Sequence, residues 1–413
     1  MLDSEFYDEL EIREPEEREM QLLEALARQF KAARRDSPYF AELFKDIGAD
    51  DVRSRADLAK LPITRKSDLH ALQKKNPPLA GMTTIAHGNL LRIYQSPGPT
   101  YDPEAAGKDW WGIGRSLYAA GVRPGDIIHN SFSYHLTPAA MMVEGGAQAI
   151  GCAVIPAGTG QSDQQAQAMA HIGATAYAGT PSFLKVLLDR AKELGLDTSR
   201  LTKAIVGGEA LTDALRRELK DRGVAALNCY ASADLGLIAY ESKAADGLIV
   251  DERLIIEIVR PGTGEQLPPG EVGEVVATSL NREYPLIRFA TGDLSAAMPG
   301  LSPCGRTNMR LRGWLGRADQ TTKVKGMFVH PAQVAEVAKR HPEIVRARLV
   351  VDRAEGQDVM TLRCETAETG EALAAAVAKS LTAVSNLKGR VELLKPGQLP
   401  NDGRVIEDKR RLT

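Results

Sequence analysis

Short apolar runs alternate with longer amphipathic stretches in the middle of the chain, and this alternation predicts parallel β/α units. Because strands and helices in alternation build a parallel sheet covered on both faces, we expect an α/β fold. Such sheets bind ligands at the carboxyl ends of their strands, so functional residues are expected in the loops that follow. The expected strands are residues 91–94, 126–131, 152–156, 175–178, 203–206 and 225–230, with helix-like stretches at 103–120, 162–171, 181–194 and 212–222.

The two ends of the chain have different patterns. Apolar residues at helical spacing, among them Leu22, Leu26 and Phe30, predict a helical start over residues 1–75. Residues 247–302 combine short β-like runs with Pro-Gly turns, a combination typical of hairpins. Beyond residue 317 the pattern predicts a mixed α+β segment, with helices at 331–340 and 371–384 and strands at 345–352, 358–365 and 390–394.

We therefore expect two domains. The large N-terminal domain, residues 1–316, comprises the helical start (1–75), a βαβ core with mainly parallel strands (90–236) and an attached β-rich part (247–302). The small α+β C-terminal domain spans residues 317–413, which is enough chain for an independent unit.

The composition of the chain argues against several classes of function. The chain has 413 residues, 43% of them hydrophobic, and can bury a core without disulfides. Its 52 Lys and Arg against 54 Asp and Glu give a net charge of -2, which does not favour nucleic acid or an anionic membrane surface as partner. The four cysteines lack CxxC spacing and the histidines lack HxxxH or HExxH spacing, so no metal-hydrolase site is indicated. With no recognisable signal peptide or membrane span, we expect a cytoplasmic protein with small-molecule partners.

Three polar stretches follow expected strands. In the first, residues 96–103 (SPGPTYDP), Ser96, Gly98 and Thr100 are small or hydroxylated residues of the kind that bind phosphate through backbone N–H groups. A Pro-rich turn that only connects two elements is the simpler alternative. Asp102 also argues against a phosphate loop, because a carboxylate there would repel phosphate.

The second stretch, Gly207-Gly208-Glu209-Ala210, lies upstream of Tyr230-Ala231-Ser232-Ala233-Asp234. Two glycines after a strand let a planar ring approach the backbone, and Tyr230 offers an aromatic face for that ring. Asp234 offers an oxygen ligand for magnesium. A helix-entry turn and a core tyrosine are equally open alternatives.

The third stretch combines Asp293, in the sequence Arg-Phe-Ala-Thr-Gly-Asp, with Arg317 in Gly-Arg-Ala-Asp. An aspartate after a glycine turn can bind two ribose hydroxyls, and an arginine can reach ribose or phosphate. Each signal alone is weak.

Together and in this order, the three stretches resemble the adenylate-forming superfamily of acyl- and aryl-CoA synthetases, and within it the phenylacetate–CoA ligase branch. The resemblance extends to stretches without obvious catalytic duty, such as residues 37–40 (SPYF), 61–66 (LPITRK), 151–156 (GCAVIP) and 179–182 (GTPS). It implies an ATP-dependent ligase that activates a small aromatic, phenylacetate-like carboxylic acid as an acyl-adenylate. Coenzyme A would then displace AMP after the C-terminal lobe rotates, with magnesium as the metal.

The resemblance also assigns roles to particular residues. The adenine would be lined by Gly207, Gly208, Glu209 and Ala210, and Tyr230 would stack on it beside Ala231 and Ser232. Asp293 would bind the ribose, Arg317 would lie beside the nucleotide, and Asp234 would bind magnesium. Asp319 would be the hinge, coenzyme A would be faced by Lys325 and Gly326, and the aromatic acid by Tyr134 and His135.

Several positions depart from the family pattern. The phosphate loop, approximately SSGTTGKPT in the family, reads SPGPTYDPE here, so that Asp102 replaces a lysine. The usual threonine of the YGxTE-like motif is Ala233. The family's C-terminal catalytic lysine aligns with Arg404 or falls in a deletion, and Lys409 is the other candidate. Only Cys304 remains of the paired cysteines that hold zinc in some relatives, so we expect no zinc.

These departures keep two alternatives open: a non-catalytic member that binds nucleotide or acyl ligand, and transfer of the adenylate to another acceptor. The retained Asp293, Arg317 and Asp319 favour the ligase. The identity of the acid and the oligomeric state, with a homodimer as one alternative, are left open by the sequence.

Overall fold

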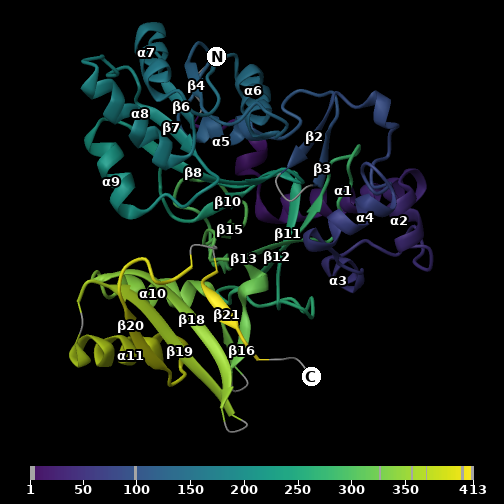
Figure 1. Cartoon of the computed structure of the whole chain (residues 1–413). Coiled ribbons are helices and arrows are strands. Elements are labelled where there is room, and N and C mark those ends of the chain that lie inside the picture. Colours follow the sequence, from purple (N-terminus) through teal and green to yellow (C-terminus); the bar gives the residue numbers. More distant parts are fainter. Residues whose placement is uncertain are drawn as a thin grey trace.

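The β/α units predicted in the middle of the chain form one half of a nine-stranded mixed sheet (Figure 1). The computed structural model describes residues 5–96, 100–324, 327–354, 357–368, 370–400 and 404–410. In the parallel half, the strands β4, β5, β6 and β7 are each followed by a helix that returns to the opposite end, whereas β8 continues directly into the antiparallel β9. The strand order is β14 (Ala297–Met298), β15 (Arg310–Leu311), β10 (Leu248–Val250), β9 (Gly236–Glu241), β8 (Ala225–Ser232), β7 (Lys203–Val206), β6 (Ala176–Gly179), β4 (Ile127–Asn130) and β5 (Ala153–Pro156), with β4 to β8 parallel and the rest antiparallel.

Both faces of the parallel half are covered, as its apolar strands require. On β6, Ala176 and Ala178 pack against Ile113 of α5 (Ile113–Ala119) and Met142 of α6 (Ala139–Ile150). Tyr177 points to the other face, where α7 (Ser162–Ile172), α8 (Pro181–Glu193) and α9 (Asp213–Asp221) pack. The predicted doubly covered α/β sheet is therefore confirmed.

A second sheet of four strands joins the helical N-terminus to the β-rich part. Its order is β1 (Thr64–Arg65), β13 (Phe289–Ser295), β12 (Gly273–Ser279) and β11 (Leu254–Val259). The apolar face of α1 (Pro15–Asp36), including Leu26 and Phe30, packs in the same core as Ile255 and Phe289. The helices α2 (Pro38–Leu43), α3 (Arg55–Lys60) and α4 (Leu69–Lys75) and the 3-10 turns η1 (Glu9–Ile12), η2 (Lys66–Asp68) and η3 (His87–Asn89) complete this region.

The helix predicted at 103–120 is shorter than expected. Strand β3 (Thr100–Glu104) pairs with β2 (Arg92–Ser96) as an antiparallel hairpin, so the chain is extended where the helix was expected to begin. Helix α5 begins only after Gly112, whose φ of 76° is left-handed and ends the irregular segment before it. Within the stretch predicted to bind phosphate, Ser96 and Thr100 are thus paired strand residues rather than parts of a strand–helix connection, and residues 97–99 lie outside the described residues.

The C-terminal part forms a separate lobe with its own sheet, in the order β20 (Arg390–Leu394), β19 (Gln357–Thr366), β18 (Ile344–Ala354) and β21 (Ile406–Asp408). Helices α10 (Pro331–Lys339) and α11 (Glu371–Ser385) cover it, and β16 (Thr322–Val324) pairs with β17 (Met327–Val329). The described residues of its hydrophobic core all come from within 324–406, such as Val337, Leu349 and Leu381. The 3-10 turn η4 (Ala318–Gln320) connects it to the rest of the chain.

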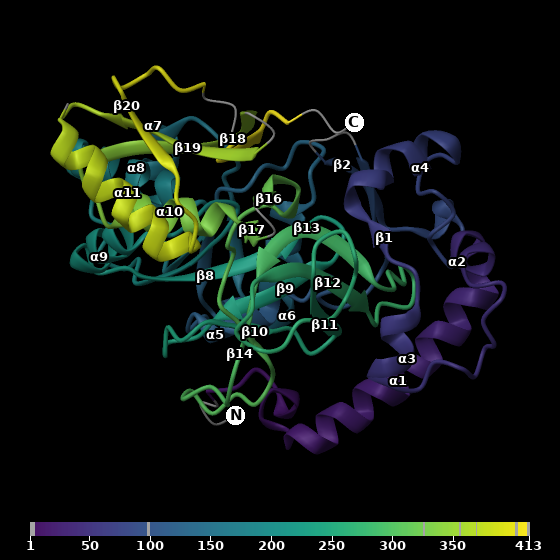
Figure 2. The same cartoon turned by 90° about the horizontal axis from the view of Figure 1, so that it is seen from below.

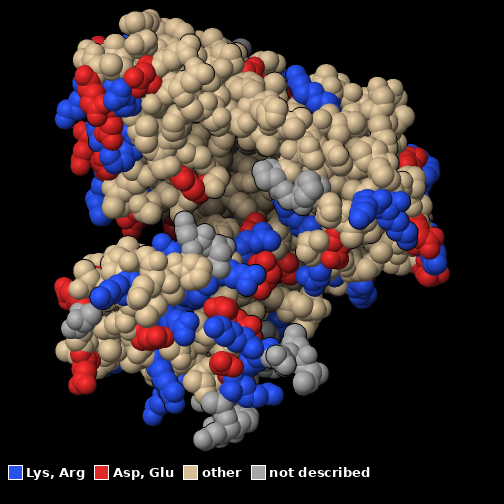
Figure 3. All heavy atoms as spheres, in the orientation of Figure 1, with Lys and Arg blue, Asp and Glu red and all other residues tan. Residues whose placement is uncertain are grey.

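The lobe and the N-terminal helices lie on different sides of the central sheets in both views (Figures 1 and 2). Figure 3 shows a hollow between the lobe and the larger part of the molecule, with charged side chains of both signs on the lobe beside it. An ion pair of 3.7 Å between the exposed side chains of Lys339 and Asp213 connects α10 of the lobe to α9 of the larger part. None of the described helices is long and apolar enough to cross a membrane.

Candidate functional site

A cavity of about 530 Å³ lies at the carboxyl ends of β7 and β8, where the sequence predicted a ligand. We call it the Asp293 cavity. Its walls come from five separate segments of the chain, represented by Gly208, Tyr230, Leu248, Asp293 and Trp314.

Asp293 is the centre of the hydrogen bonds in this cavity. Its Oδ2 accepts from the Tyr230 hydroxyl at 2.8 Å, and its Oδ1 accepts from Arg317 Nη1 at 3.0 Å and from Trp314 Nε1 at 3.1 Å. The backbone brings the partners together, because Asp293 and Arg317 form an isolated antiparallel bridge. Three of the predicted nucleotide residues therefore meet at one carboxylate.

The backbone around Asp293 requires a glycine. Gly292 has φ of 76°, and a Cβ there would lie 2.6 Å from Arg317 Nη2. A side chain would therefore both strain the turn and displace the guanidinium. Burial, reinforced by the charge of Asp293, raises the pKa of Tyr230 well above its usual range, so its hydroxyl keeps the proton that it donates.

Trp314 is a site residue that the sequence reasoning missed. Its side chain is 55% exposed although it lines the cavity and bonds to Asp293. The indole combines a large apolar face with an N–H donor, so an exposed tryptophan on a cavity wall is suited to contact a planar ligand. The sequence feature that could have indicated Trp314 is its position between Gly313 and Gly316, three residues before the predicted Arg317.

The glycine turn after β7 lies at the border of two cavities. The Gly207 N–H donates to Gly179 O at 3.1 Å, and a Cβ on Gly207 would meet Cys229 O at 3.0 Å. Gly208, Glu209 and Ala210 line the Asp293 cavity. A carboxylate oxygen of Glu209 accepts from the Ser182 N–H at 2.6 Å, which ties the turn to the start of α8.

A second cavity of about 370 Å³ adjoins the first and shares Gly208, Cys229 and Ala231 with it. We call it the Lys66 cavity. It is mainly apolar, with Lys66, Ser96, Thr137 and Ser232 as polar residues. The apolar wall consists of side chains from α5, β7, α6 and the loop before α6, namely Ile113, Phe132, Pro138, Ala139, Met142, Val143 and Ile205.

The loop before α6 contributes different residues from those predicted. Phe132 and Thr137 line the Lys66 cavity, whereas Tyr134 and His135 are not among its lining residues. The Tyr134 hydroxyl donates to Glu144 Oε1 at 2.7 Å, and His135 is exposed. Phe132 stands between polar residues in Ser-Phe-Ser-Tyr-His, and its apolar ring was the signal available in the sequence.

Lys66 and Asp234 form an ion pair beside the Lys66 cavity, with Nζ 2.5 Å from Oδ2. The Asp234 side chain is 1% exposed, and its other oxygen, Oδ1, is buried without a hydrogen-bond partner among the described residues. The stretch 61–66 belongs to the part of the sequence that resembles the family, but the resemblance predicts no role for Lys66. Its proximity to Asp234 depends on chain segments 168 residues apart.

Asp102 has a different environment from the one the sequence suggested. It lies within β3, is 0% exposed, and accepts a hydrogen bond from the Ser96 hydroxyl across the hairpin. Burial, together with the charge of Asp234, raises its pKa to about 7, although Ser96 and Lys66 oppose this shift. This carboxyl therefore keeps its proton to a much higher pH than an ordinary aspartate, which weakens the expected repulsion of phosphate.

The residues at Asp234 do not fit a magnesium ion bound by the protein. Magnesium needs about six oxygen ligands at roughly 2.0–2.1 Å and usually keeps several waters. Here the ammonium of Lys66 already contacts one carboxylate oxygen, and a divalent ion on the other would experience repulsion of several kcal/mol. Among the described residues, no group of three His, Cys, Asp or Glu side chains could hold a metal.

The C-terminal candidates do not meet either cavity. Lys409 follows β21, has Nζ 3.7 Å from Glu407 Oε1 and is absent from both cavity linings, as is Arg404. Asp319 lies in η4 with its carboxylate 3.6 Å from Arg317 Nε. Gly98, Lys325 and Gly326 lie outside the described residues.

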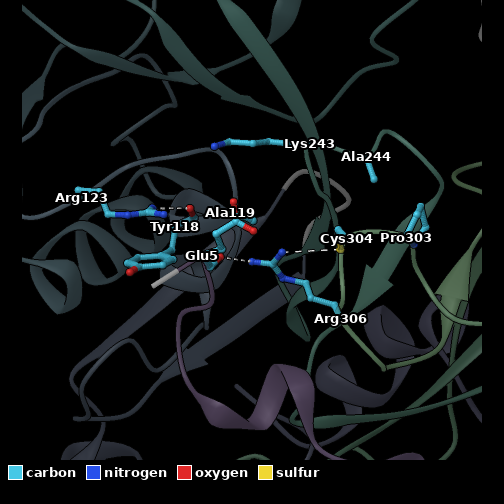
Figure 4. A pocket seen from close by; sticks show the side chains of 9 residues that line it. All are labelled: Glu5, Tyr118, Ala119, Arg123, Lys243, Ala244, Pro303, Cys304 and Arg306. Carbon is cyan, nitrogen blue, oxygen red and sulfur yellow. Dashed lines mark hydrogen bonds between the residues drawn. The ribbon is translucent and has the colours of Figure 1, made fainter. Parts of the chain in front are cut away.

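Cys304 lines a third pocket, of about 280 Å³, that shares no lining residue with the other two (Figure 4). Arg306 Nη1 donates to Cys304 Sγ at 3.7 Å, and Arg306 Nη2 donates to Glu5 O at 3.0 Å. Burial opposes the thiolate, but hydrogen bonds from Ser242, Ser302 and Arg306 outweigh it and lower the pKa of Cys304. Cys304 is the only cysteine of this pocket's described lining.

Comparison with known proteins gives matches of three kinds. The model of the AMP-binding enzyme family matches residues 112–281. The chain is 32% identical over 361 residues to a phenylacetate-coenzyme A ligase of Aromatoleum evansii (83% of this chain, 80% of the relative) and 31% identical over 349 residues to one of Thermus thermophilus (80% and 77%). An open conformation of 2-hydroxyisobutyryl-CoA ligase, in complex with 2-HIB-AMP and CoA, superposes with a TM-score of 0.86 at 22% identity, covering 99% of this chain and 95% of that chain. At this identity the superposition establishes the fold.

Proposed function

Because the chain belongs to the phenylacetate–coenzyme A ligase family of AMP-binding enzymes, we propose that it activates a small aromatic carboxylic acid with ATP and transfers the acyl group to coenzyme A. In the first half-reaction a carboxylate oxygen attacks the α-phosphorus of ATP and pyrophosphate leaves. In the second, the thiol of coenzyme A attacks the carbonyl carbon of the acyl-adenylate, loses its proton and displaces AMP.

The observation that carries this proposal is the adjacency of two unlike cavities. The Asp293 cavity offers a carboxylate, an exposed indole and a glycine turn, which suit a ribose and a purine. The Lys66 cavity offers an apolar wall and one cation, which suit an aromatic acid. The two share Gly208, Cys229 and Ala231, so an acid in one would present its carboxylate to a nucleotide in the other.

The predicted nucleotide residues that line the Asp293 cavity have roles in this arrangement. Asp293 would accept from the ribose hydroxyls, in exchange for some of its present bonds to Tyr230, Trp314 and Arg317. A carboxylate binds such hydroxyls with charge-assisted hydrogen bonds, which are stronger than neutral ones. The purine would lie between the glycine turn and the aromatic side chains.

The C-terminal lobe would deliver coenzyme A. We propose the domain boundary at residues 316/317, with Asp319 as the hinge and Lys325 and Gly326 on the face that meets coenzyme A. Support comes from the lobe's separate core and from the position of η4 as its connection to the rest of the chain. A mobile lobe also agrees with the exposure of the ion pair between α10 and α9, because exposed pairs contribute little to stability.

Pyrophosphate release, measured with ATP and a panel of aromatic and short aliphatic acids, tests the proposal. We expect release with phenylacetate and similar acids, much less with acetate, and a thioester product only when coenzyme A is present. Pyrophosphate release without any thioester would favour another acceptor for the adenylate.

A non-catalytic function is the second candidate, and one observation favours it: neither Arg404 nor Lys409 lines a cavity in this arrangement of the lobe. That function would bind AMP and acid but release no pyrophosphate with any acid of the panel. Calorimetry with AMP alongside the release assay separates the two candidates.

A further inference from the structure

The two-residue strand β1 fixes the position of Lys66. Thr64 and Arg65 pair in parallel with Phe289 and Ala290 of β13, and the Thr64 N–H donates to Arg288 O at 3.1 Å. Lys66 follows directly, at the start of η2. It is therefore held beside the same strand that carries Asp293.

Asp234 directs the ammonium toward the cavity. The carboxylate is buried, with 1% of its side chain exposed, whereas the Lys66 side chain is 34% exposed and lines the Lys66 cavity. An ammonium has three N–H donors, and Asp234 is its one hydrogen-bond partner among the described residues. Two donors are thus left for a ligand.

The surroundings keep Lys66 charged. Burial disfavours the ammonium, but Asp234, with smaller contributions from Asp102 and Asp293, outweighs burial and raises the pKa of Lys66 above its usual value. A permanent cation therefore lies at the polar end of an otherwise apolar cavity, next to the glycine turn shared with the Asp293 cavity.

Resting on the proposed ligase function, we propose that Lys66 is the resident cation of the acid-binding site. It takes the place that a protein-bound magnesium ion would have at Asp234, and it donates hydrogen bonds to the carboxylate of the acid substrate. This makes Lys66 a catalytic residue, because it contacts the group that attacks ATP. Its charge lessens the repulsion between that carboxylate and the α-phosphate, and Asp234 is the residue that positions it.

Calorimetry with phenylacetate and its uncharged analogue phenylacetamide tests the contact. In Lys66→Met we expect phenylacetate to bind roughly ten- to a hundredfold more weakly, because one charge-assisted hydrogen bond is lost. Phenylacetamide, whose neutral amide oxygen accepts a weaker hydrogen bond from an ammonium than a carboxylate does, should lose much less affinity than phenylacetate. Lys66→Arg should recover part of the loss. The matched control is Lys60→Met, which removes a lysine paired with Asp57 on the surface.

Equal weakening of both ligands in Lys66→Met would overturn the inference, since it indicates a structural role. Unchanged binding of phenylacetate would overturn it as well, while leaving the ligase proposal intact. A parent protein that binds neither ligand would contradict the proposed aromatic acid and this inference together. Lys66→Met leaves the Asp234 carboxylate buried and unpaired, which can unfold the protein. If this single variant does not fold, the double variant Lys66→Met/Asp234→Asn, which removes both charges, is measured in its place in the same assay.

The replacement of magnesium has its own test, with Mn²⁺ alone as the probe. We expect Asp234→Asn to leave the binding of Mn²⁺ to the nucleotide-free protein unchanged, as measured by electron paramagnetic resonance. A stoichiometric Mn²⁺ site in the parent that disappears in Asp234→Asn would overturn the inference.

Discussion

The hydroxyl of Tyr230 donates to Asp293 Oδ2 at 2.8 Å, which joins the end of β8 to β13 across 63 residues of sequence. The ring therefore stands at the edge of the Asp293 cavity with its orientation fixed by the carboxylate expected to bind ribose. Trp314 and Arg317 hold the other oxygen of Asp293. One partly buried carboxylate thus orders three side chains that would contact a nucleotide.

Replacing Asp293 with alanine should weaken the binding of AMP. The change removes two charge-assisted hydrogen bonds to ribose and frees Tyr230 and Arg317 from their partner, so we expect a loss of about 1.5–3 kcal/mol, or roughly ten- to a hundredfold in Kd. Isothermal calorimetry measures this, with the exposed Asp50→Ala as control. Equal AMP affinity in the parent and Asp293→Ala would contradict the ribose assignment.

Trp314 should report nucleotide binding by fluorescence. The protein has three tryptophans, of which Trp111 is buried and Trp110 half-buried, so Trp314 is the exposed indole. We expect AMP to quench the emission of the parent and to have little effect in Trp314→Phe. Trp314→Leu should also lose affinity, by about 0.5–1.5 kcal/mol, because ring contact is removed. Quenching that persists in Trp314→Phe would show that the nucleotide binds near another tryptophan.

The stability of the protein should depend on pH through Asp102. The carboxyl has an ordinary pKa of 3.8 and a folded-state pKa of about 7. Between these values the folded protein holds the proton and the unfolded chain does not, so the free energy of unfolding should fall as the pH rises from about 4 to 7.

Asp102→Asn cannot ionise and should lose this slope. Above pH 7 the variant should be more stable than the parent by roughly 2–4 kcal/mol, and the difference should shrink toward pH 4. Urea unfolding at pH 5 and pH 8 measures the free energy of unfolding of the parent and of Asp102→Asn, with the exposed Asp50→Asn as control. Parallel stability profiles of the parent and Asp102→Asn would show that the carboxyl ionises normally.

Asp319→Pro should separate the two half-reactions. A hinge must change its backbone angles, whereas proline fixes φ near roughly -65°. In the present arrangement the hydrogen bonds of η4 use the N–H groups of Gln320 and Thr321 rather than that of Asp319, so proline removes none of them. We expect one half-reaction, pyrophosphate release or thioester formation from a preformed adenylate, to fall far more than the other.

The melting temperature must accompany this measurement, because destabilisation would lower both rates. Asp319→Ala is the matched control, since it removes the same side chain and leaves the backbone free. A folded Asp319→Pro variant in which both half-reactions fall by the same factor would refute the rotating lobe.

The sequence by itself determined the elements whose pattern is local. Alternating apolar runs placed the strands of the parallel sheet, helical spacing placed α10 and α11, and the strand predicted at 390–394 coincides with β20. It also indicated Tyr230, Asp293 and Arg317 as parts of one nucleotide site, because their motifs, taken together and in this order, resemble those of the adenylate-forming superfamily. Periodicity and turn chemistry act over a few residues, and a single sequence shows both.

Tertiary structure decided the rest. The β2–β3 hairpin turns Asp102 inward, the parallel pairing of β1 with β13 brings Lys66 to Asp234, and the antiparallel bridge at Asp293 brings Trp314 into the cavity. These contacts join segments up to 168 residues apart. Whether Asp102 repels phosphate or Asp234 holds a metal depends on the charge that the fold places beside each carboxylate and on how far it excludes water. Neither quantity is a property of the local sequence, because both arise only when distant segments pack together.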